Sequence, residues 1–132
     1  MPIDTLATWH QLVKSHDAKG LDALLDDAAV FLSPVVHKPQ LGKAITAKYL
    51  GAAFHVFFNE SFRYVRELKG ERDAVLEFEV EIDGLSVNGV DMIKWNDAGL
   101  ITEFKVMLRP LKAVNLIHEK MGAMLQAASS LS

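Results

Sequence analysis

Asp91 is the side chain of this sequence best suited to chemistry, because its neighbours are apolar. In a segment that alternates like a β-strand, Asp91 shares one face with Val87 and Ile93. An ionised carboxylate buried without a partner is costly, so such a group forms a pair, accepts several hydrogen bonds or takes up a proton. Asp91 is therefore a candidate acid, base or hydrogen-bond donor. The sequence leaves open a structural alternative, in which Asp91 bonds to a neighbouring tyrosine, histidine or backbone amide.

Two histidines are further candidates. His16 lies at the predicted end of the first helix, where it could shuttle protons beside a cavity. A histidine there also interacts favourably with the helix dipole, and this structural role is the favoured one. His37 lies in a loop between Pro34 and Pro39, and loops on rigid scaffolds often hold binding groups, although an exposed histidine without a function is commoner. No histidine stands at a spacing from a carboxylate that suggests zinc, so no metal site is expected.

The composition argues against several classes of protein. The chain of 132 residues, 50% of them hydrophobic, is predicted to form one domain over residues 1–132. A net charge of −3 without a basic run argues against nucleic-acid binding, and the lack of cysteine excludes disulfides and thiolate nucleophiles. The sequence begins without a targeting leader, and no apolar run is long enough to cross a membrane, so we expect a cytoplasmic protein.

The spacing of apolar residues predicts the elements that must position these side chains. The expected helices cover residues 5–16 and 21–25, run from 42 into 54–58, and begin again at 110. The expected strands cover residues 29–33, 61–68, 76–82, 86–95 and 100–109. Turns such as Asp83-Gly84 join consecutive strands into an antiparallel meander. Helices first and strands later predict the α+β class, with a curved antiparallel sheet and helices packed on its concave face.

Two segments of the sequence carry a family resemblance. VFLSPVVHKPQLGKAI (30–45) and GVDMIKWNDAGLI (89–101) resemble the cone-shaped, cystatin-like domains of the SnoaL-like, nuclear transport factor 2-like (NTF2-like) superfamily. Residues 29–45 and 90–108 also match ketosteroid isomerases of that superfamily without gaps. The resemblance implies a pocket on the concave face of the sheet.

The match with ketosteroid isomerases gives individual residues an implied position. Asp91 falls at the aspartate of the isomerase oxyanion hole, which acts in its protonated form in that family. Ser33 stands at the position of the catalytic base, and Leu12 stands at the position of the oxyanion-hole tyrosine. A serine without an activating partner is not a competent base at neutral pH, so steroid isomerisation is not expected.

The resemblance also implies a ligand cavity. Phe104, Val106 and Leu108 share the face that lines the cavity in the superfamily, while Met107 faces the convex side, where many relatives form a homodimer. Aromatic residues of the predicted helices belong mostly to the core, and one or two are expected to reach the cavity. The expected ligand-binding residues are Trp9, Leu12, Ser33, His37, Phe54, Phe58, Phe104, Val106 and Leu108.

Two functions of different classes follow. In the first, the domain encloses a small, mostly apolar molecule that Asp91 orients. Any catalysis would then be proton transfer without a cofactor, of the isomerase, cyclase or dehydratase type, with Asp91 and His16 as catalytic residues. The alternative is a non-catalytic ligand-binding or dimerisation module whose own side chains fill the cavity. In either case we expect a homodimer through the convex sheet face, without nucleic-acid or membrane partners.

Overall fold

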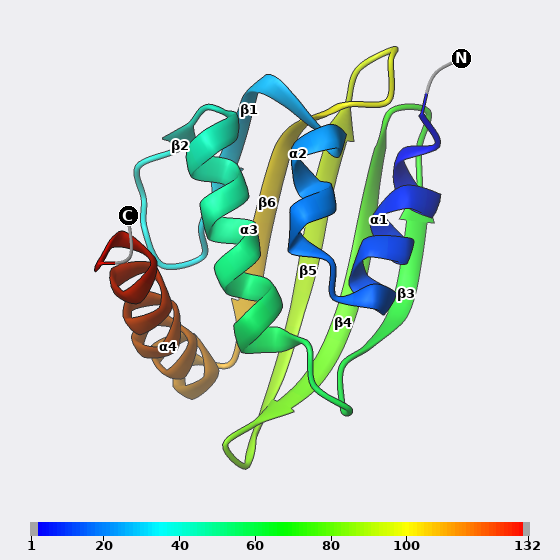
Figure 1. Ribbon diagram of the computed structural model, residues 1–132. Coiled ribbons are helices and arrows are strands. Elements are labelled where there is room, and N and C mark those ends of the chain that lie inside the picture. The colour runs from blue at the N-terminus through cyan, green and yellow to red at the C-terminus, as the bar shows by residue number, and fades with distance from the viewer. Residues whose placement is uncertain (1–2, 131–132) are drawn as a thin grey trace.

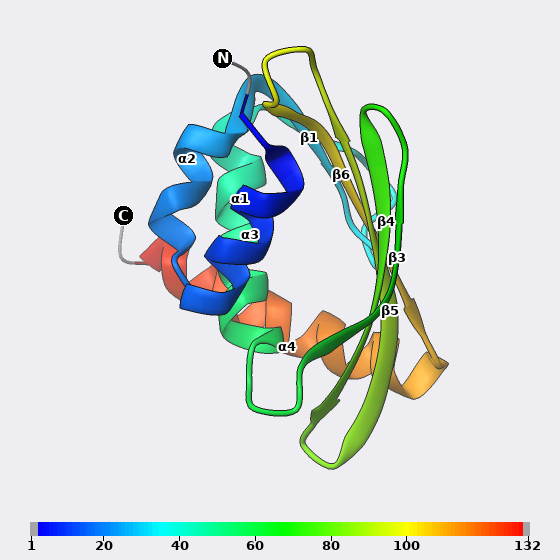
Figure 2. The ribbon, with the colours of Figure 1, turned by 90° about the vertical axis from the view of Figure 1, so that its right-hand side faces the viewer.

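The helices lie on one side of a curved sheet, and the C-terminal helix crosses the lower end of that side in Figure 2. The structure is a computed structural model that describes residues 3–130 (Figure 1). Its elements are α1 (Thr5–Ser15), η1 (Ala18–Gly20), α2 (Leu21–Leu24), β1 (Leu25–Leu32), β2 (Gln40–Leu41), α3 (Lys43–Phe57), β3 (Arg63–Lys69), β4 (Asp73–Ile82), β5 (Leu85–Trp95), β6 (Ile101–Arg109) and α4 (Leu111–Ser130).

The strands form one open sheet in the order β2-β1-β6-β5-β4-β3. Strands β3 to β6 are antiparallel neighbours, as their connecting turns predict. Strand β1 pairs with β6 in parallel, so the sheet is mixed rather than wholly antiparallel. Turn residues report only on strands that follow one another, whereas β1 and β6 are distant in sequence. The α+β class and the helix-covered concave face are confirmed.

The first strand begins earlier than its composition predicts. Leu21, Leu24 and Leu25 have helical spacing and are all buried, but α2 ends at Leu24. Leu25 instead starts β1 and pairs with Ile101 of β6, so the strand begins there rather than at Ala29. Burial in the sheet determines this boundary, and local spacing does not.

Helix α1 has a defined start and end. The Asp4 side chain accepts a hydrogen bond of 3.1 Å from the amide of Ala7, which satisfies one of the free N–H groups at the helix start. His16 ends the helix in the left-handed conformation, with φ at 55°. Between them, Trp9 points into the core, so α1 presents this side chain to the concave face of the sheet.

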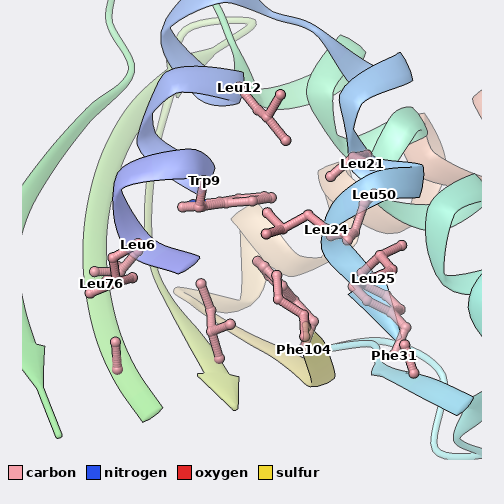
Figure 3. Close-up of a cluster of buried hydrophobic side chains, with 14 of the residues drawn as sticks. Leu6, Trp9, Leu12, Leu21, Leu24, Leu25, Phe31, Leu50, Leu76 and Phe104 are labelled. Atoms are coloured by element: carbon pink, nitrogen blue, oxygen red, sulfur yellow. The ribbon is translucent and has the colours of Figure 1, made fainter. Parts of the chain in front are cut away.

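The core beneath the helices has two parts. In the first, the Trp9 ring contacts those of Phe54 and Phe104, with centroid distances of 5.7 and 4.9 Å. Figure 3 shows Trp9 beside Phe104 in this cluster. In the second, Ile117 and Met121 of α4 are buried in one cluster with residues of α3, β4 and β5. Helix α4 therefore packs on the same concave side of the sheet as the other helices. No helix within residues 3–130 is long and apolar enough to cross a membrane.

Candidate functional site at Asp91

Asp91 occupies the middle of β5 and faces the helices. It pairs with Leu76 of β4 on one side and with Val106 of β6 on the other. Its exposure is 7%, and Leu76 and Ile93 are fully buried. The alternation predicted from the sequence thus places a carboxyl in the apolar interior.

Asp91 receives a hydrogen bond from a tyrosine on β3. The Tyr64 hydroxyl donates to Oδ2 of Asp91 at 2.7 Å, and Nε1 of Trp9 donates to the Tyr64 oxygen at 3.0 Å. An indole N–H can only donate, so the Tyr64 oxygen accepts from Trp9 and its own hydrogen is directed to Asp91. The three side chains form a directional chain from α1 through β3 to β5.

This environment changes the acidity of two groups. Burial raises the pKa of Asp91 to about 7, and the hydrogen bond from Tyr64 opposes part of that rise. Burial, followed by the neighbouring Asp91 charge, raises the pKa of Tyr64 well above its ordinary value. At neutral pH Asp91 therefore exchanges between its protonated and ionised forms, while Tyr64 remains a hydrogen-bond donor.

An apolar cavity of about 30 Å³ lies beside Asp91. Its wall consists of Trp9, Leu50, Ala53, Phe54, Phe57, Phe58, Phe62, Phe78, Asp91, Phe104 and Val106. Asp91 is the one charged side chain in this wall. Among the described residues, Oδ1 of Asp91 has no hydrogen-bond partner. Every fully buried side-chain oxygen or nitrogen atom described does have a partner, so Oδ1 is not fully buried. This second carboxyl oxygen is therefore accessible and is the polar atom that the cavity offers to a ligand.

Gly89 lies two residues before Asp91 on the same face of β5, where side chains of β4 and β6 pack closely against the backbone. A Cβ at this position would lie 2.5 Å from Cζ of Phe78 and 2.7 Å from Cδ2 of Leu108. Both distances are too short for any side chain other than hydrogen. The glycine is therefore explained by close packing of two neighbouring strands against β5.

A second, larger cavity of about 150 Å³ lies beneath α4. It is bounded by the end of β1 with its following loop, by α3, by β6 and by α4. Its wall is mostly apolar but includes Ser33, Tyr49 and His118. Ala53, Phe57 and Val106 line both cavities, so the two adjoin on either side of these side chains.

Ser33 organises the loop that follows β1. Its Oγ accepts hydrogen bonds from the amides of Val35 and Val36, at 3.1 and 3.3 Å. Such a contact is typical of a serine that stabilises a turn. Ser33 lines the cavity beneath α4, whereas Asp91 lines the adjoining one.

The predicted ligand-binding residues divide between these places. The wall beside Asp91 includes Trp9, Phe54, Phe58, Phe104 and Val106, and the wall beneath α4 includes Ser33 and Val106. The other three predicted residues lie elsewhere. Leu12 is buried in the core, His37 is exposed in its loop, and Leu108 packs against the cluster that contains α4.

The other predicted catalytic residue, His16, is exposed at the end of α1. Its ring contacts Phe58, which lines the cavity beside Asp91, at a centroid distance of 5.7 Å. The hydrogen bond to Asp91 comes from Tyr64 instead. A catalytic role for His16 stays a prediction, while its position at the helix end fits the structural role.

Tyr64 is the main residue of the site that sequence reasoning did not identify. A β-bulge between Tyr64 and Arg66 changes the register with β4, so simple alternation does not report the face of each residue. A signal was nevertheless present, because a buried aspartate needs a partner and the chain has only two tyrosines. Residues 3–130 contain no group of three side chains able to hold a metal ion.

Sequence comparisons with families and curated proteins find nothing. No protein-family model matches the chain, and no curated protein matches it. Solved structures, in contrast, match over most of its length.

Two of these structures are related in sequence as well as in fold. A steroid delta-isomerase from Pseudomonas aeruginosa is 38% identical with a TM-score of 0.90, and the match covers 96% of this chain and 92% of that one. An uncharacterized bacterial protein with a cystatin-like fold, from Silicibacter pomeroyi DSS-3, is 34% identical with a TM-score of 0.83, covering 91% and 84%.

An NTF2-like protein of unknown function from Mesorhizobium loti is 18% identical with a TM-score of 0.70, covering 81% of this chain and 89% of that one. This third match supports the fold alone. Together the matches confirm the resemblance carried by residues 30–45 and 89–101. At the identity and coverage of the first two, the chain belongs to the NTF2-like (SnoaL-like) superfamily, in a branch that is uncharacterised.

Proposed function

We propose that the domain binds a small, mostly apolar carbonyl compound beside Asp91. Protonated Asp91 donates a hydrogen bond from its cavity-facing oxygen to the carbonyl of this ligand. The observation that carries the proposal is the Trp9–Tyr64–Asp91 chain, which ends at an accessible carboxyl oxygen in an otherwise apolar wall. Small-molecule sites commonly combine an apolar enclosure with a few fixed polar groups.

The chemistry that fits this arrangement is proton transfer next to the carbonyl group. A hydrogen bond to the carbonyl oxygen stabilises the negative charge that develops there when a water molecule takes up a proton from the neighbouring carbon. A group with a pKa close to neutral can also give and regain a proton at physiological pH, and the pKa of Asp91 is about 7. This reaction class needs no cofactor.

Similarity to the steroid delta-isomerase supports an isomerase-type reaction. Ser33, however, argues against a steroid as the substrate of this chain. Ser33 holds two backbone amides of its own loop, and it is not a base at neutral pH. We therefore propose the reaction class and the carbonyl contact, without the steroid.

One observation favours a non-catalytic module instead. The cavity beside Asp91 measures about 30 Å³, and large aromatic side chains fill most of its surroundings. A protein that uses this fold only for association would fill its cavity in the same way. Ligand binding is therefore the first property to test.

Trp9 provides an intrinsic reporter, because it lines the cavity and donates to Tyr64. A Trp95→Phe background leaves Trp9 as the one tryptophan of the chain. We expect 4-phenylcyclohexanone to quench its fluorescence, and Asp91→Leu, which has no donor, to weaken that binding by about tenfold, which corresponds to one hydrogen bond. The hydrocarbon phenylcyclohexane should bind both proteins equally. Equal binding of ketone and hydrocarbon to both proteins would contradict the carbonyl contact.

Catalysis is tested separately from binding. In D₂O, the hydrogens next to the carbonyl of 4-phenylcyclohexanone exchange for deuterium, and NMR measures the rate. We expect the wild-type protein to accelerate this exchange and Asp91→Leu, which has no donor, to lose most of the acceleration. Binding without acceleration would favour the non-catalytic module.

We also propose that two copies associate through the convex face of the sheet. The register places Leu68 opposite Val75, and Val90 opposite Met107, on the face away from the helices. Leu68 and Met107 are 61% and 49% exposed in the single chain. Light scattering after size-exclusion chromatography should give a dimer for the wild type and a monomer for Met107→Glu. A monomeric wild type would exclude this association.

A further inference from the structure

The two adjoining cavities set the shape of a ligand that would occupy both. Ala53 and Phe57 of α3 and Val106 of β6 contribute to both walls. Val106 is also the cross-strand partner of Asp91. A molecule that contacts Asp91 and displaces these side chains would enter the larger cavity beneath α4. Such a ligand is elongated, and its far end lies beside α4.

The far cavity offers hydrogen-bond donors. The Ser33 oxygen already accepts from two amides, so the hydrogen of its hydroxyl is the part left for a ligand. His118 reaches the same wall from α4 and is otherwise exposed. Among the described residues, His118 has no hydrogen-bond or ion-pair partner. No aspartate or glutamate lies in the described wall, so a ligand anion would meet no like charge there.

Gly122 is a second sign that this wall is left open. It lies one helical turn after His118, on the same face of α4, and it lines the cavity. A Cβ at Gly122 would have no described atom within 4 Å. Glycine makes a helix less stable than alanine does, and here no close packing requires it. Gly122 is exposed, so the cavity opens to solvent beside it, and a ligand can extend there without a clash.

We propose that the cavity beneath α4 binds a carboxylate at the far end of an elongated ligand whose carbonyl group contacts Asp91. The inference rests on the proposed function, because it assigns the second end of the same ligand. The Ser33 hydroxyl and an imidazole N–H of His118 each donate a hydrogen bond to the carboxylate. Hydrogen bonds to an ionised acceptor are stronger than those between neutral groups, so both donors favour a carboxylate over an uncharged end group.

Two ketones that differ by one carboxylate test this assignment. The probes are 4-phenylcyclohexanone and 4-(4-oxocyclohexyl)benzoate, and Trp9 fluorescence in the Trp95→Phe background gives both dissociation constants. We expect the keto acid to bind about tenfold more tightly than the ketone. His118→Leu should remove most of this advantage and leave the affinity for the plain ketone unchanged. His55→Leu, at an exposed histidine of α3, is the matched control and should change neither affinity.

Gly122→Leu tests the space itself. Leucine is a better helix former than glycine, so the thermal stability of the variant should not fall. Its side chain would occupy the cavity beneath α4. The dissociation constant of the keto acid should therefore rise at least about tenfold. Unchanged binding to Gly122→Leu would overturn the proposal.

The outcomes separate this inference from the proposed function. If Asp91→Leu weakens both probes while His118→Leu leaves the advantage of the keto acid intact, the carbonyl site stands and the carboxylate site is wrong. If the keto acid binds no more tightly than the ketone, the carboxylate site is also wrong. If Asp91→Leu affects neither probe, the proposed function itself fails.

Discussion

Replacing Asp91 by asparagine should remove a pH dependence of folding stability that this one carboxyl causes. Burial raises the pKa of Asp91 from its ordinary value of 3.8 to about 7 in the folded protein. Between these values the folded protein holds a proton that the unfolded chain has released. The free energy of unfolding therefore falls as the pH rises through this window. The contribution of the group is greatest below about pH 4 and is lost once the pH passes about 7.

The size of the effect follows from the same two values. Each pH unit within the window changes the free energy of unfolding by about 1.4 kcal/mol. From pH 5 to pH 8 the wild type should lose roughly 2.5 kcal/mol through Asp91, because the carboxyl passes from mostly protonated to mostly ionised. Asparagine cannot ionise, and its oxygen can still accept the Tyr64 hydrogen bond. The variant should therefore lack this loss.

Urea denaturation, followed by circular dichroism at half-unit steps from pH 5 to pH 8, measures the difference directly. Other titrating groups contribute equally to both proteins, so the gap between the two stability curves isolates Asp91. Asp27→Asn is the control, because the Asp27 side chain is 100% exposed, and its curve should run parallel to that of the wild type. A parallel curve for Asp91→Asn would refute the buried, proton-holding carboxyl.

Three further substitutions test the surroundings of the site. Tyr64→Phe should cost about 1–3 kcal/mol, and more at pH 8 than at pH 5, because it removes the hydrogen bond to ionised Asp91; equal losses at both pH values in urea denaturation would contradict this. Gly89→Ala should cost about 1–3 kcal/mol through overpacking, whereas Gly122→Ala should stabilise by roughly 0.5–1 kcal/mol, so equal signs in thermal denaturation would be unexpected. Ser33→Ala should cost about 1–2 kcal/mol by leaving two loop amides unbonded, and an unchanged melting temperature would argue against that role.

The sequence predicted the position of Asp91 because a strand has a period of two. Val87, Asp91 and Ile93 share a buried face in β5, as their spacing requires. The meander of β3 to β6 was equally predictable, since its turns lie between consecutive strands. These features depend only on neighbouring residues.

The partner of Asp91 was not predictable in the same way. The match with ketosteroid isomerases places Leu12 of α1 at the position of a tyrosine, but here the hydroxyl comes from Tyr64 of β3. A bulge next to Tyr64 changes the register of β3, and such a bulge has no simple local signature. The structure also shows a site between the two sequence-based alternatives, because Asp91 is bonded to a tyrosine and still lines a cavity.

Helix α4 illustrates a second limit of sequence reasoning. Pro110 and the apolar stripe that follows indicate where the helix begins, but not where it packs. Only long-range contacts place Ile117 and Met121 on the cavity side and bring His118 to the wall that Ser33 also lines. The sequence therefore did not indicate that His118, rather than another histidine, lines a cavity.

In the proposed complex, Asp91 holds a proton near neutral pH and shares it with a carbonyl ligand. Carbon-13 NMR of protein labelled at the aspartate carboxyl carbons measures this directly, with Asp91→Asn assigning the signal. We predict a titration midpoint near pH 7, as the structure gives, and a higher midpoint when 4-phenylcyclohexanone is bound, since the ligand prefers the protonated form. A midpoint near the ordinary aspartate value of 3.8 that the ketone does not move would contradict the account.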